Sequence, residues 1–327
     1  MYYPRFLEAN DTIGICAPSA GVGRNIKLFE DSLHILKAHG FHIYETKHVR
    51  VNNLRGGTAA ERAAEVNELF RRDDIRVLMA AAGGDFLLEI LLMLDWEMII
   101  QNPKWFLGAS DPTSILFPLT TVYDIASLYG YNAAGFQQVP PSINPQNCLS
   151  FLKGQLPIQQ NSSMHAKFSR YAKEYCGFDT PTLYQASANE LHLSGRCIGG
   201  CIEVIKDLML TPYEDVHGFI DRYQSDKILW YFDVYAWSAE NLYRTLLQMR
   251  YAGWFHHCSG ILFGRVLYPS SETGMTYAEA IMKALDDIPY IYDMDIGHTL
   301  PAFTLMNGAI AHVDYHNGAC SLCFERK

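Results

Sequence analysis

The sequence predicts an α/β protein of two domains, the first built on a doubly wound, mostly parallel sheet. Short apolar runs alternate with amphipathic stretches of helical spacing, which is typical of a parallel sheet covered by helices on both faces. A stretch rich in proline and amide side chains interrupts this alternation near residue 137, and the pattern resumes in the second half. We therefore expect a first domain over 1–165, a linker over 166–186, and a smaller C-terminal α/β domain over 187–327.

The first half contains strand patterns and helix patterns in turn. A buried strand over 11–18 leads to the small-residue turn 18–21, a helix follows over 27–38, and Gly40 ends it. The remaining expected strands cover 41–49, 75–82 and 104–109. The remaining expected helices cover 59–70 and 86–94, with a further one after Asp111.

The second half resumes the alternation with a segment over 197–210 that begins at Gly199-Gly200 and becomes helical. Strands are expected over 227–234, 260–266 and 290–296, and helices over 240–249 and 277–285. The chain then closes with one or two strands over 309–323.

Composition excludes several classes of protein. The 327 residues are 49% hydrophobic and 19% charged, as in a globular protein with a large core. A net charge of -9 argues against nucleic-acid binding and against an anionic membrane surface. No export signal or membrane-spanning run is visible, so we expect a cytosolic protein with reduced thiols. Cys320 and Cys323 have CxxC spacing, but no second pair or histidine pair completes a metal set, and we expect no metal or cofactor.

The stretch 102–116, NPKWFLGASDPTSIL, reads as a strand, a tight corner and a helix start. This order lifts the Ser110 hydroxyl clear of the sheet beside backbone N–H groups that lack helical partners. Such N–H groups can stabilise an oxyanion. A serine at this place is also an ordinary helix cap, so it needs a histidine base and an acid to count as a nucleophile.

Twelve histidines are candidates for that base. His298 differs from the others because it follows an expected strand and precedes Pro301, which places it in a loop at a strand end. Asp233 and Asp295 both lie at comparable strand ends, and spacing alone does not choose between them. The remaining candidates that we considered lie in or beside helices: His34, His39, His42, His256 and His257.

Several blocks in order give the chain a resemblance to the LD-carboxypeptidase family of serine peptidases, family S66. They are DTIGICAPS, AAAGGD, NPKWFLGASDPT, KILWYFD, AGWF with GILFGR, and DIGH. The family includes muramoyltetrapeptide carboxypeptidases of peptidoglycan recycling and microcin-C immunity peptidases. The resemblance implies an N-terminal α/β domain with a serine elbow, a C-terminal domain that supplies the acid and the histidine, and a homodimer.

Carried over by position, the resemblance implies Ser110 as nucleophile, His298 as base and Asp233 as acid. The oxyanion donors would be the backbone N–H groups of Asp111 and of Gly84 in the Gly83-Gly84 pair. Arg55 and Arg265 are candidate clamps for a substrate carboxylate, because an arginine fork binds carboxylates. The implied substrate is a peptide with a free carboxylate, such as a cytosolic murein peptide.

The chain departs from the family pattern at several positions. Asp233 stands where glutamate is usual, Ala109 where an aromatic residue is usual, and Pro112 replaces a residue with a free N–H. Two alternatives therefore stay open: a peptidase that detoxifies a peptidyl-nucleotide, and a binding protein that lost catalysis. The first alternative needs an aromatic platform for a base, for which the tryptophans are candidates: Trp96, Trp105, Trp230, Trp237 and Trp254.

Overall fold

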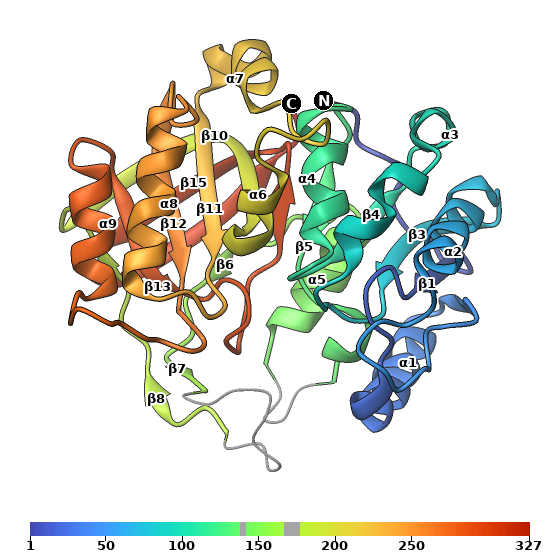
Figure 1. Cartoon of the computed structure of the whole chain (residues 1–327). Coiled ribbons are helices and arrows are strands. Elements are labelled where there is room, and N and C mark those ends of the chain that lie inside the picture. The colour runs from blue at the N-terminus through green and yellow to red at the C-terminus, as the bar shows by residue number, and fades with distance from the viewer. Residues whose placement is uncertain (138–141, 167–176) are drawn as a thin grey trace. The chain divides into compact units, whose positions relative to one another are not determined.

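The computed structural model describes residues 1–137, 142–166 and 177–327, which form two compact units (Figure 1). The first unit holds Met1–Pro157 together with Thr304–Asn307. The second holds Ile158–Phe303 and Gly308–Lys327. Each unit has its own sheet and its own buried apolar core.

The first unit is built on a six-stranded sheet in the order β14-β5-β4-β3-β1-β2. All neighbouring strands are parallel except β14, which runs antiparallel to β5. Because β1 lies between β2 and β3, the strand order reverses there, and ligands in such sheets bind beyond the carboxyl ends at this switch point. The strands are β1 (Thr12–Cys16), β2 (His42–Glu45), β3 (Ile75–Ala80), β4 (Trp105–Gly108), β5 (Ser127–Tyr129) and β14 (Leu305–Asn307).

Helices cover both faces of this sheet, because the strand order reverses at β1 while the crossovers between parallel strands stay right-handed. Helix α2 packs on β1 and β3 and also against α3, whereas α1 packs on β2 and against the turn Ala133–Gly135. Thr58 and Glu61 form a capping box that fixes the start of α2. The helices are α1 (Ile26–Ala38), α2 (Ala59–Arg71), α3 (Trp96–Gln101), α4 (Thr113–Thr121) and α5 (Asn144–Leu152), with a 3₁₀ turn at Gly23–Asn25.

The second unit has an eight-stranded mixed sheet in the order β6-β16-β15-β10-β11-β12-β13-β9. Its centre, β10 to β13, is parallel, and antiparallel strands extend both edges. A separate pair joins β7 (Met164–His165) to β8 (Thr180–Pro181). The sheet strands are β6 (Gln159–Gln160), β9 (Gln185–Ala186), β10 (Glu190–Cys201), β11 (Ile228–Asp233), β12 (Cys258–Gly264), β13 (Tyr290–Met294), β15 (Ile310–His316) and β16 (Ala319–Glu325).

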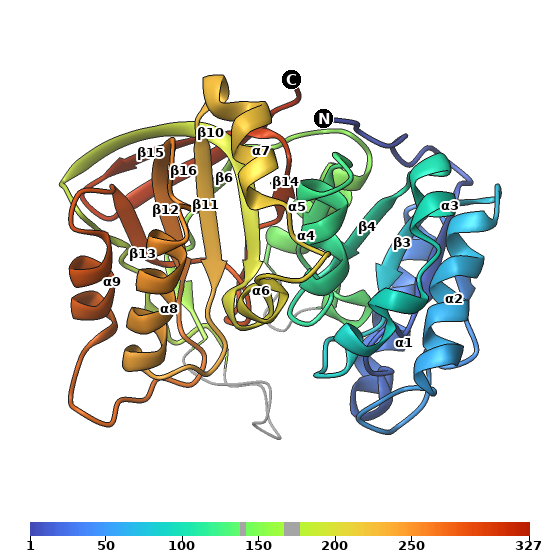
Figure 2. The ribbon, with the colours of Figure 1, turned by 45° about the horizontal axis from the view of Figure 1, so that its top comes forward.

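Helices α8 and α9 lie side by side on one face of this sheet (Figures 1 and 2). Ser238 caps α8, and Thr276 with Glu279 forms a capping box at the start of α9. The helices of this unit are α6 (Ile202–Leu208), α7 (Val216–Tyr223), α8 (Ala239–Tyr251) and α9 (Tyr277–Leu285), with a 3₁₀ turn at Gln224–Asp226. Among the described residues, none of the helices is both long and apolar enough to cross a membrane.

The predicted fold class is confirmed: the chain is an α/β protein whose first sheet is mostly parallel. Two elements differ from expectation. The segment expected as a helix over 86–94 is a 3₁₀ helix, Leu87–Met93, so Gly83-Gly84 does not open a helix directly. The segment after residue 197 continues as strand β10 to Cys201, because Gly199 and Gly200 pair in register with Tyr231 and Phe232 of β11.

The expected domain boundaries also differ from the observed units. The first unit ends at Pro157 instead of residue 165, and β14 returns to it from near the end of the chain. The expected linker over 166–186 falls in part on residues 167–176, outside the described residues, whereas β8 and β9 belong to the second unit. The second unit is also not smaller than the first. Two-residue strands show no alternation, so polar segments that contain them read as linker.

Candidate functional site

Ser110 lies at a sharp corner between β4 and α4. Its φ of 70° falls in the left-handed region, which a non-glycine residue occupies only when its surroundings hold it there. The Asn132 side chain holds the preceding residue: it accepts from the Ala109 N–H at 3.0 Å and donates to the Ala109 carbonyl at 3.2 Å. The Tyr129 hydroxyl accepts from the Ser110 N–H at 3.0 Å. The chain therefore makes the predicted corner at Ser110, and hydrogen bonds from Tyr129 of β5 and from Asn132 in the following loop hold its backbone in place.

Backbone groups that could stabilise an oxyanion surround this corner. The first helical hydrogen bond of α4 runs from the Thr113 N–H to the Ser110 carbonyl at 2.9 Å, so the N–H of Asp111 precedes the helical bonds. The Gly83-Gly84 loop after β3 lies directly against the serine, since a Cβ built on Gly83 would be 3.2 Å from Ser110 Oγ. The structure thus brings Gly83, Ser110 and Asp111 together in the first unit.

The carboxylate of Asp111 ties the serine corner to two neighbouring loops. It accepts hydrogen bonds from the Ser19 hydroxyl, in the loop after β1, and from the Leu87 N–H at 2.9 Å. Burial raises the pKa of the Asp111 carboxyl, and the hydrogen bonds from Ser19 and Leu87 oppose that rise. A Cβ on Gly84, whose φ is +155°, would lie 2.3 Å from Ser19 Oγ, so only glycine fits this close approach.

Arg62 of α2 is hydrogen-bonded to the loop after β1 and to the loop after β3. Its side chain is completely buried, and its guanidinium donates to the carbonyls of Pro18 at 2.7 Å and Phe86 at 2.8 Å. It also pairs with Glu89 at 2.7 Å. Burial lowers the pKa of Arg62, and the nearby carboxylates of Glu89 and Asp111 oppose that change. Arg62 therefore fixes the loops after β1 and β3 at the switch point of the sheet.

Replacing Arg62 by methionine is expected to destabilise the protein by about 2–3 kcal/mol, because two buried carbonyls lose their charged donor. Urea unfolding followed by circular dichroism measures this difference. Arg71→Met, at an exposed position of the same helix, is the matched control and should stay within about 0.5 kcal/mol. Equal midpoints for the Arg62 and Arg71 variants would contradict this role of Arg62.

The second unit places His298 against Asp233. Nδ1 of His298 lies 2.7 Å from Oδ2 of Asp233, and the His298 backbone N–H donates to Oδ1 at 3.2 Å. Asp233 is completely buried, and 7% of the His298 side chain is exposed. The Nδ1 contact is close but not linear, and within the described part of the chain neither ring nitrogen has a well-aligned hydrogen-bond partner. The tyrosine ring of Tyr235 packs on the imidazole, with ring centroids 4.7 Å apart.

Gly297 explains how an aspartate, one methylene shorter than glutamate, reaches this histidine. Its φ is +87°, and a Cβ built on it would lie 1.8 Å from Asp233 Oδ1. Any side chain at 297 would therefore displace the carboxylate or the loop. The missing side chain lets the backbone before His298 approach Asp233 closely, which compensates for the shorter acid.

Gly297→Ala is expected to destabilise the protein by about 2–4 kcal/mol, because it combines a strained φ with a direct overlap. Gly274→Ala is the matched control, since Gly274 has a φ of +83° with no atom within 4 Å of its built Cβ. The control should cost only about 1 kcal/mol, from backbone strain alone. Denaturant midpoints measure both variants, and equal losses would show that the overlap with Asp233 is unimportant.

The two candidate acids, Asp233 and Asp295, have different partners in the structure, and one candidate arginine is already paired. Asp295 is completely buried and pairs with Arg265, and it also accepts from the Ser162 N–H at 2.8 Å and its hydroxyl at 2.9 Å. Asp233, not Asp295, contacts His298. Because Arg265 is committed to Asp295 and to the Asp293 carbonyl, it does not fit the role of a free carboxylate clamp. Arg55 is more than half exposed and stacks over the Phe86 ring at 4.3 Å.

The other candidate residues fall into the core or onto the surface. Trp105, Trp230 and Trp254 are buried, so only Trp96 and Trp237 keep partly exposed rings that could carry a base. Cys320 and Cys323 lie three residues apart on β16, and strand side chains at that spacing point to opposite faces, which rules out joint chelation. The histidines other than His298 that we considered are exposed: His34, His39, His42, His256 and His257.

Several positioning residues escaped sequence reasoning. Arg62, Ser19 and Asn132 act through hydrogen bonds to backbone or side chains 23 to 92 positions away, a relation that no local pattern records. Gly297 had a usable signal, because a glycine directly before a candidate histidine indicates backbone that must approach something closely. Tyr235 follows Asp233 by two positions, but only the folded loop sets its ring on His298.

Comparison with known families identifies the chain. Residues 13–130 match the LD-carboxypeptidase N-terminal domain, and residues 194–313 match the LD-carboxypeptidase C-terminal domain. The chain belongs to the LD-carboxypeptidase family. Ser110 falls within the first matched segment, and Asp233 and His298 fall within the second.

Relatives of this LD-carboxypeptidase family member carry related names. It is 25% identical to a putative carboxypeptidase from Vibrio cholerae, over 97% of this chain and 96% of that protein. It is 26% identical to the microcin C7 self-immunity protein of Escherichia coli, over 97% and 94%. A probable murein peptide carboxypeptidase from Bacillus subtilis is 22% identical, over 95% and 91%.

A solved structure extends the comparison to the fold. The microcin C7 self-immunity protein in complex with aspartyl sulfamoyl adenosine has a TM-score of 0.80 and 24% identity, and the match covers 98% of each chain. The shared fold therefore extends over both units of the chain.

Proposed function

We propose that this family member is a serine carboxypeptidase that cleaves an amide bond in murein peptides, with Ser110, His298 and Asp233 as its triad. The contact between Asp233 and His298 supports the proposal most, because it matches an acid that orients a general base. The strained corner at Ser110 adds to this support, since a nucleophile elbow holds its serine in the same way. The Bacillus subtilis relative, named as a probable murein peptide carboxypeptidase, supports the substrate class.

In the proposed reaction, Ser110 Oγ attacks the carbonyl carbon of the scissile amide while His298 Nε2 takes the hydroxyl proton. The N–H groups of Asp111 and Gly84 stabilise the oxyanion. The carbon–nitrogen bond then breaks, and His298 returns the proton to the leaving amine. Water, deprotonated by His298, attacks the carbonyl carbon of the acyl-enzyme. The bond between this carbon and Ser110 Oγ then breaks, His298 returns the proton to Oγ, and the shortened peptide leaves. Asp233 holds the imidazole orientation and stabilises its charged form throughout.

Arg55 is the proposed clamp for the substrate carboxylate. Arg55→Gln is expected to raise KM about tenfold and change kcat by no more than about twofold, because the clamp binds substrate and transition state alike. Arg71→Gln, an exposed arginine on α2, is the matched control. Steady-state kinetics on the peptide measures both, and an unchanged KM in Arg55→Gln would remove Arg55 from the binding site.

A peptidyl-nucleotide substrate is the second candidate. The relative from Escherichia coli was solved with aspartyl sulfamoyl adenosine, and the partly exposed rings of Trp96 and Trp237 are available to stack on a base. Turnover of a murein tetrapeptide and of aspartyl sulfamoyl adenosine, measured side by side, tests the two. We expect release of D-alanine from the tetrapeptide with the larger kcat/KM. Turnover of the nucleotide alone would replace the first proposal by the second.

A further inference from the structure

Glu203, at the start of α6, is a partly buried carboxylate that the triad does not use. Its Oε1 accepts hydrogen bonds from three consecutive backbone N–H groups: Tyr235 at 2.9 Å, Ala236 at 3.0 Å and Trp237 at 3.3 Å. Its Oε2 accepts from the Cys201 thiol at 3.3 Å. The pKa of Glu203 is raised, mainly because the carboxyl is buried. The hydrogen bond from the Ala236 N–H opposes this rise, and the nearby charge of Asp233 adds to it. The Glu203 side chain therefore anchors the backbone of residues 235–237.

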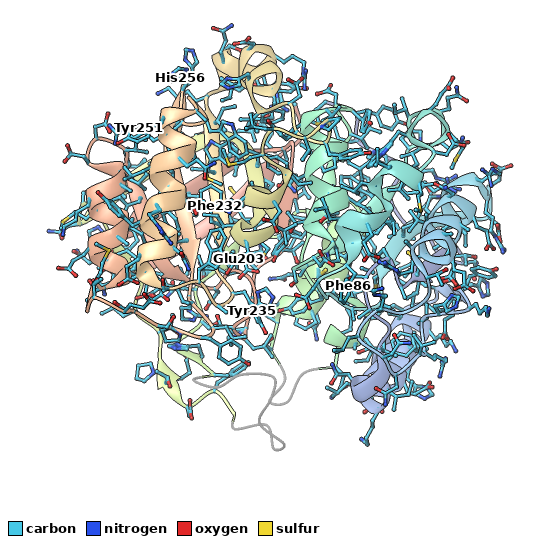
Figure 3. The ribbon with its side chains drawn as sticks, viewed as in Figure 1. Phe86, Glu203, Phe232, Tyr235, Tyr251 and His256 are labelled. Carbon is cyan, nitrogen blue, oxygen red and sulfur yellow. The ribbon has the colours of Figure 1, made fainter. Side chains whose placement is uncertain are left out.

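This loop, residues 235–237, follows shortly after Asp233, the last residue of β11. Cys201 pairs with Asp233 across β10 and β11, so Glu203 and Tyr235 each lie two residues beyond the paired ends. Figure 3 shows Glu203 and Tyr235 as neighbours, consistent with their hydrogen bond. Tyr235 is in turn the residue whose ring packs on His298. The Tyr268 N–H donates to the Tyr235 carbonyl at 3.1 Å, and the Tyr268 ring meets that of Tyr235 edge to face.

We propose that Glu203 is a positioning residue for His298: its carboxylate fixes the Tyr235–Trp237 backbone, which sets the Tyr235 ring against the imidazole. The proposal rests on the proposed function only for its kinetic consequence. The Tyr235 ring packs on the imidazole with centroids 4.7 Å apart, and this contact limits rotation of the His298 side chain. Loss of the anchor frees the loop and lets the imidazole leave its productive orientation.

Glu203→Ala removes the anchor, and Glu203→Gln keeps an acceptor oxygen at nearly the same place. Glu203→Asp keeps the charge but shortens the side chain, which protects the test if the alanine variant does not fold. Glu240→Ala is the matched control. Oε1 of Glu240 anchors a different loop, because it accepts hydrogen bonds from the Thr273 N–H at 2.9 Å and the Ser271 hydroxyl at 2.7 Å.

The first readout is independent of activity. A Tyr235 ring centred 4.7 Å from the imidazole is expected to displace the His298 ring-proton signals by its ring current, and NMR of histidine-labelled protein, assigned with His298→Gln, measures this displacement. Glu203→Ala and Glu203→Asp should move these signals toward their positions in Tyr235→Leu. Glu203→Gln should move them less, and Glu240→Ala should leave them in place. Wild-type signals in a folded Glu203→Ala variant would overturn the proposal.

The second readout is kinetic. Glu203→Ala is expected to lower kcat by about 10- to 100-fold with KM within about twofold, because misplaced catalytic groups cost rate more than binding. The double variant Glu203→Ala with Tyr235→Leu should have a kcat no lower than that of the slower single variant, because both substitutions act on the contact between Tyr235 and His298. If the two losses of kcat multiplied in the double variant, Glu203 would not act through Tyr235. If Ser110→Ala kept full turnover, the proposed function would fail, and the NMR readout would still decide the role of Glu203.

Discussion

Replacing Ser110 by alanine is expected to lower turnover of the murein peptide by about 10³- to 10⁶-fold, the range that loss of a serine nucleophile produces. The substitution removes only the oxygen that forms the acyl-enzyme, and the corner itself is held by Asn132 and Tyr129, so the fold should not change. Release of D-alanine from a purified, folded variant measures the effect.

Ser114→Ala is the matched control for this prediction, because Ser114 is a buried serine on the adjoining helix α4. Its turnover should stay within about threefold of the parent protein. A Ser110→Ala variant that hydrolyses the peptide at the parent rate would exclude Ser110 as nucleophile, and with it the proposed reaction.

Asp233→Asn is expected to lower kcat by about 10³- to 10⁴-fold with little effect on KM, because an amide no longer holds the imidazole in the tautomer that accepts the serine proton. The contact at risk is the one between Asp233 and Nδ1 of His298 at 2.7 Å. Steady-state kinetics across a range of peptide concentrations separates kcat from KM.

Asp295→Asn is the control that distinguishes a catalytic carboxylate from a structural one. Asp295 is equally buried, but it pairs with Arg265 and Ser162 and not with His298. This variant should lose stability while the folded fraction keeps its kcat. A larger loss of kcat in Asp295→Asn than in Asp233→Asn would reverse the assignment of the acid.

The parts of the fold that follow local patterns could be predicted from the sequence. Strand β4 and helix α4 flank a small-residue corner, so the position of Ser110 between a strand and a helix was predictable from apolar runs and helix-opening residues. The 3₁₀ helix Leu87–Met93 was not, because its apolar spacing over seven residues does not separate a 3₁₀ helix from an α-helix.

Features that depend on distant pairing could not be predicted in the same way. Strand β14 has three residues and joins a sheet whose other strands lie more than 170 positions earlier, so no periodicity marks it. Spacing alone likewise could not separate Asp233, the last residue of β11, from Asp295, the residue after β13; the resemblance named Asp233, and the coordinates show that it lies against His298. Glu203 looks like an ordinary first-turn acid of a helix, and only the folded loop reveals its three backbone donors.

The central claim, that His298 activates Ser110, is tested most directly by the rate at which a fluorophosphonate probe labels the protein. We expect one label, which peptide mass spectrometry locates at Ser110. It should be absent from Ser110→Ala, and labelling should be slower by about 100-fold or more in His298→Ala. A parent protein that binds the peptide but takes no label, or a His298→Ala variant labelled as fast as the parent, would contradict it.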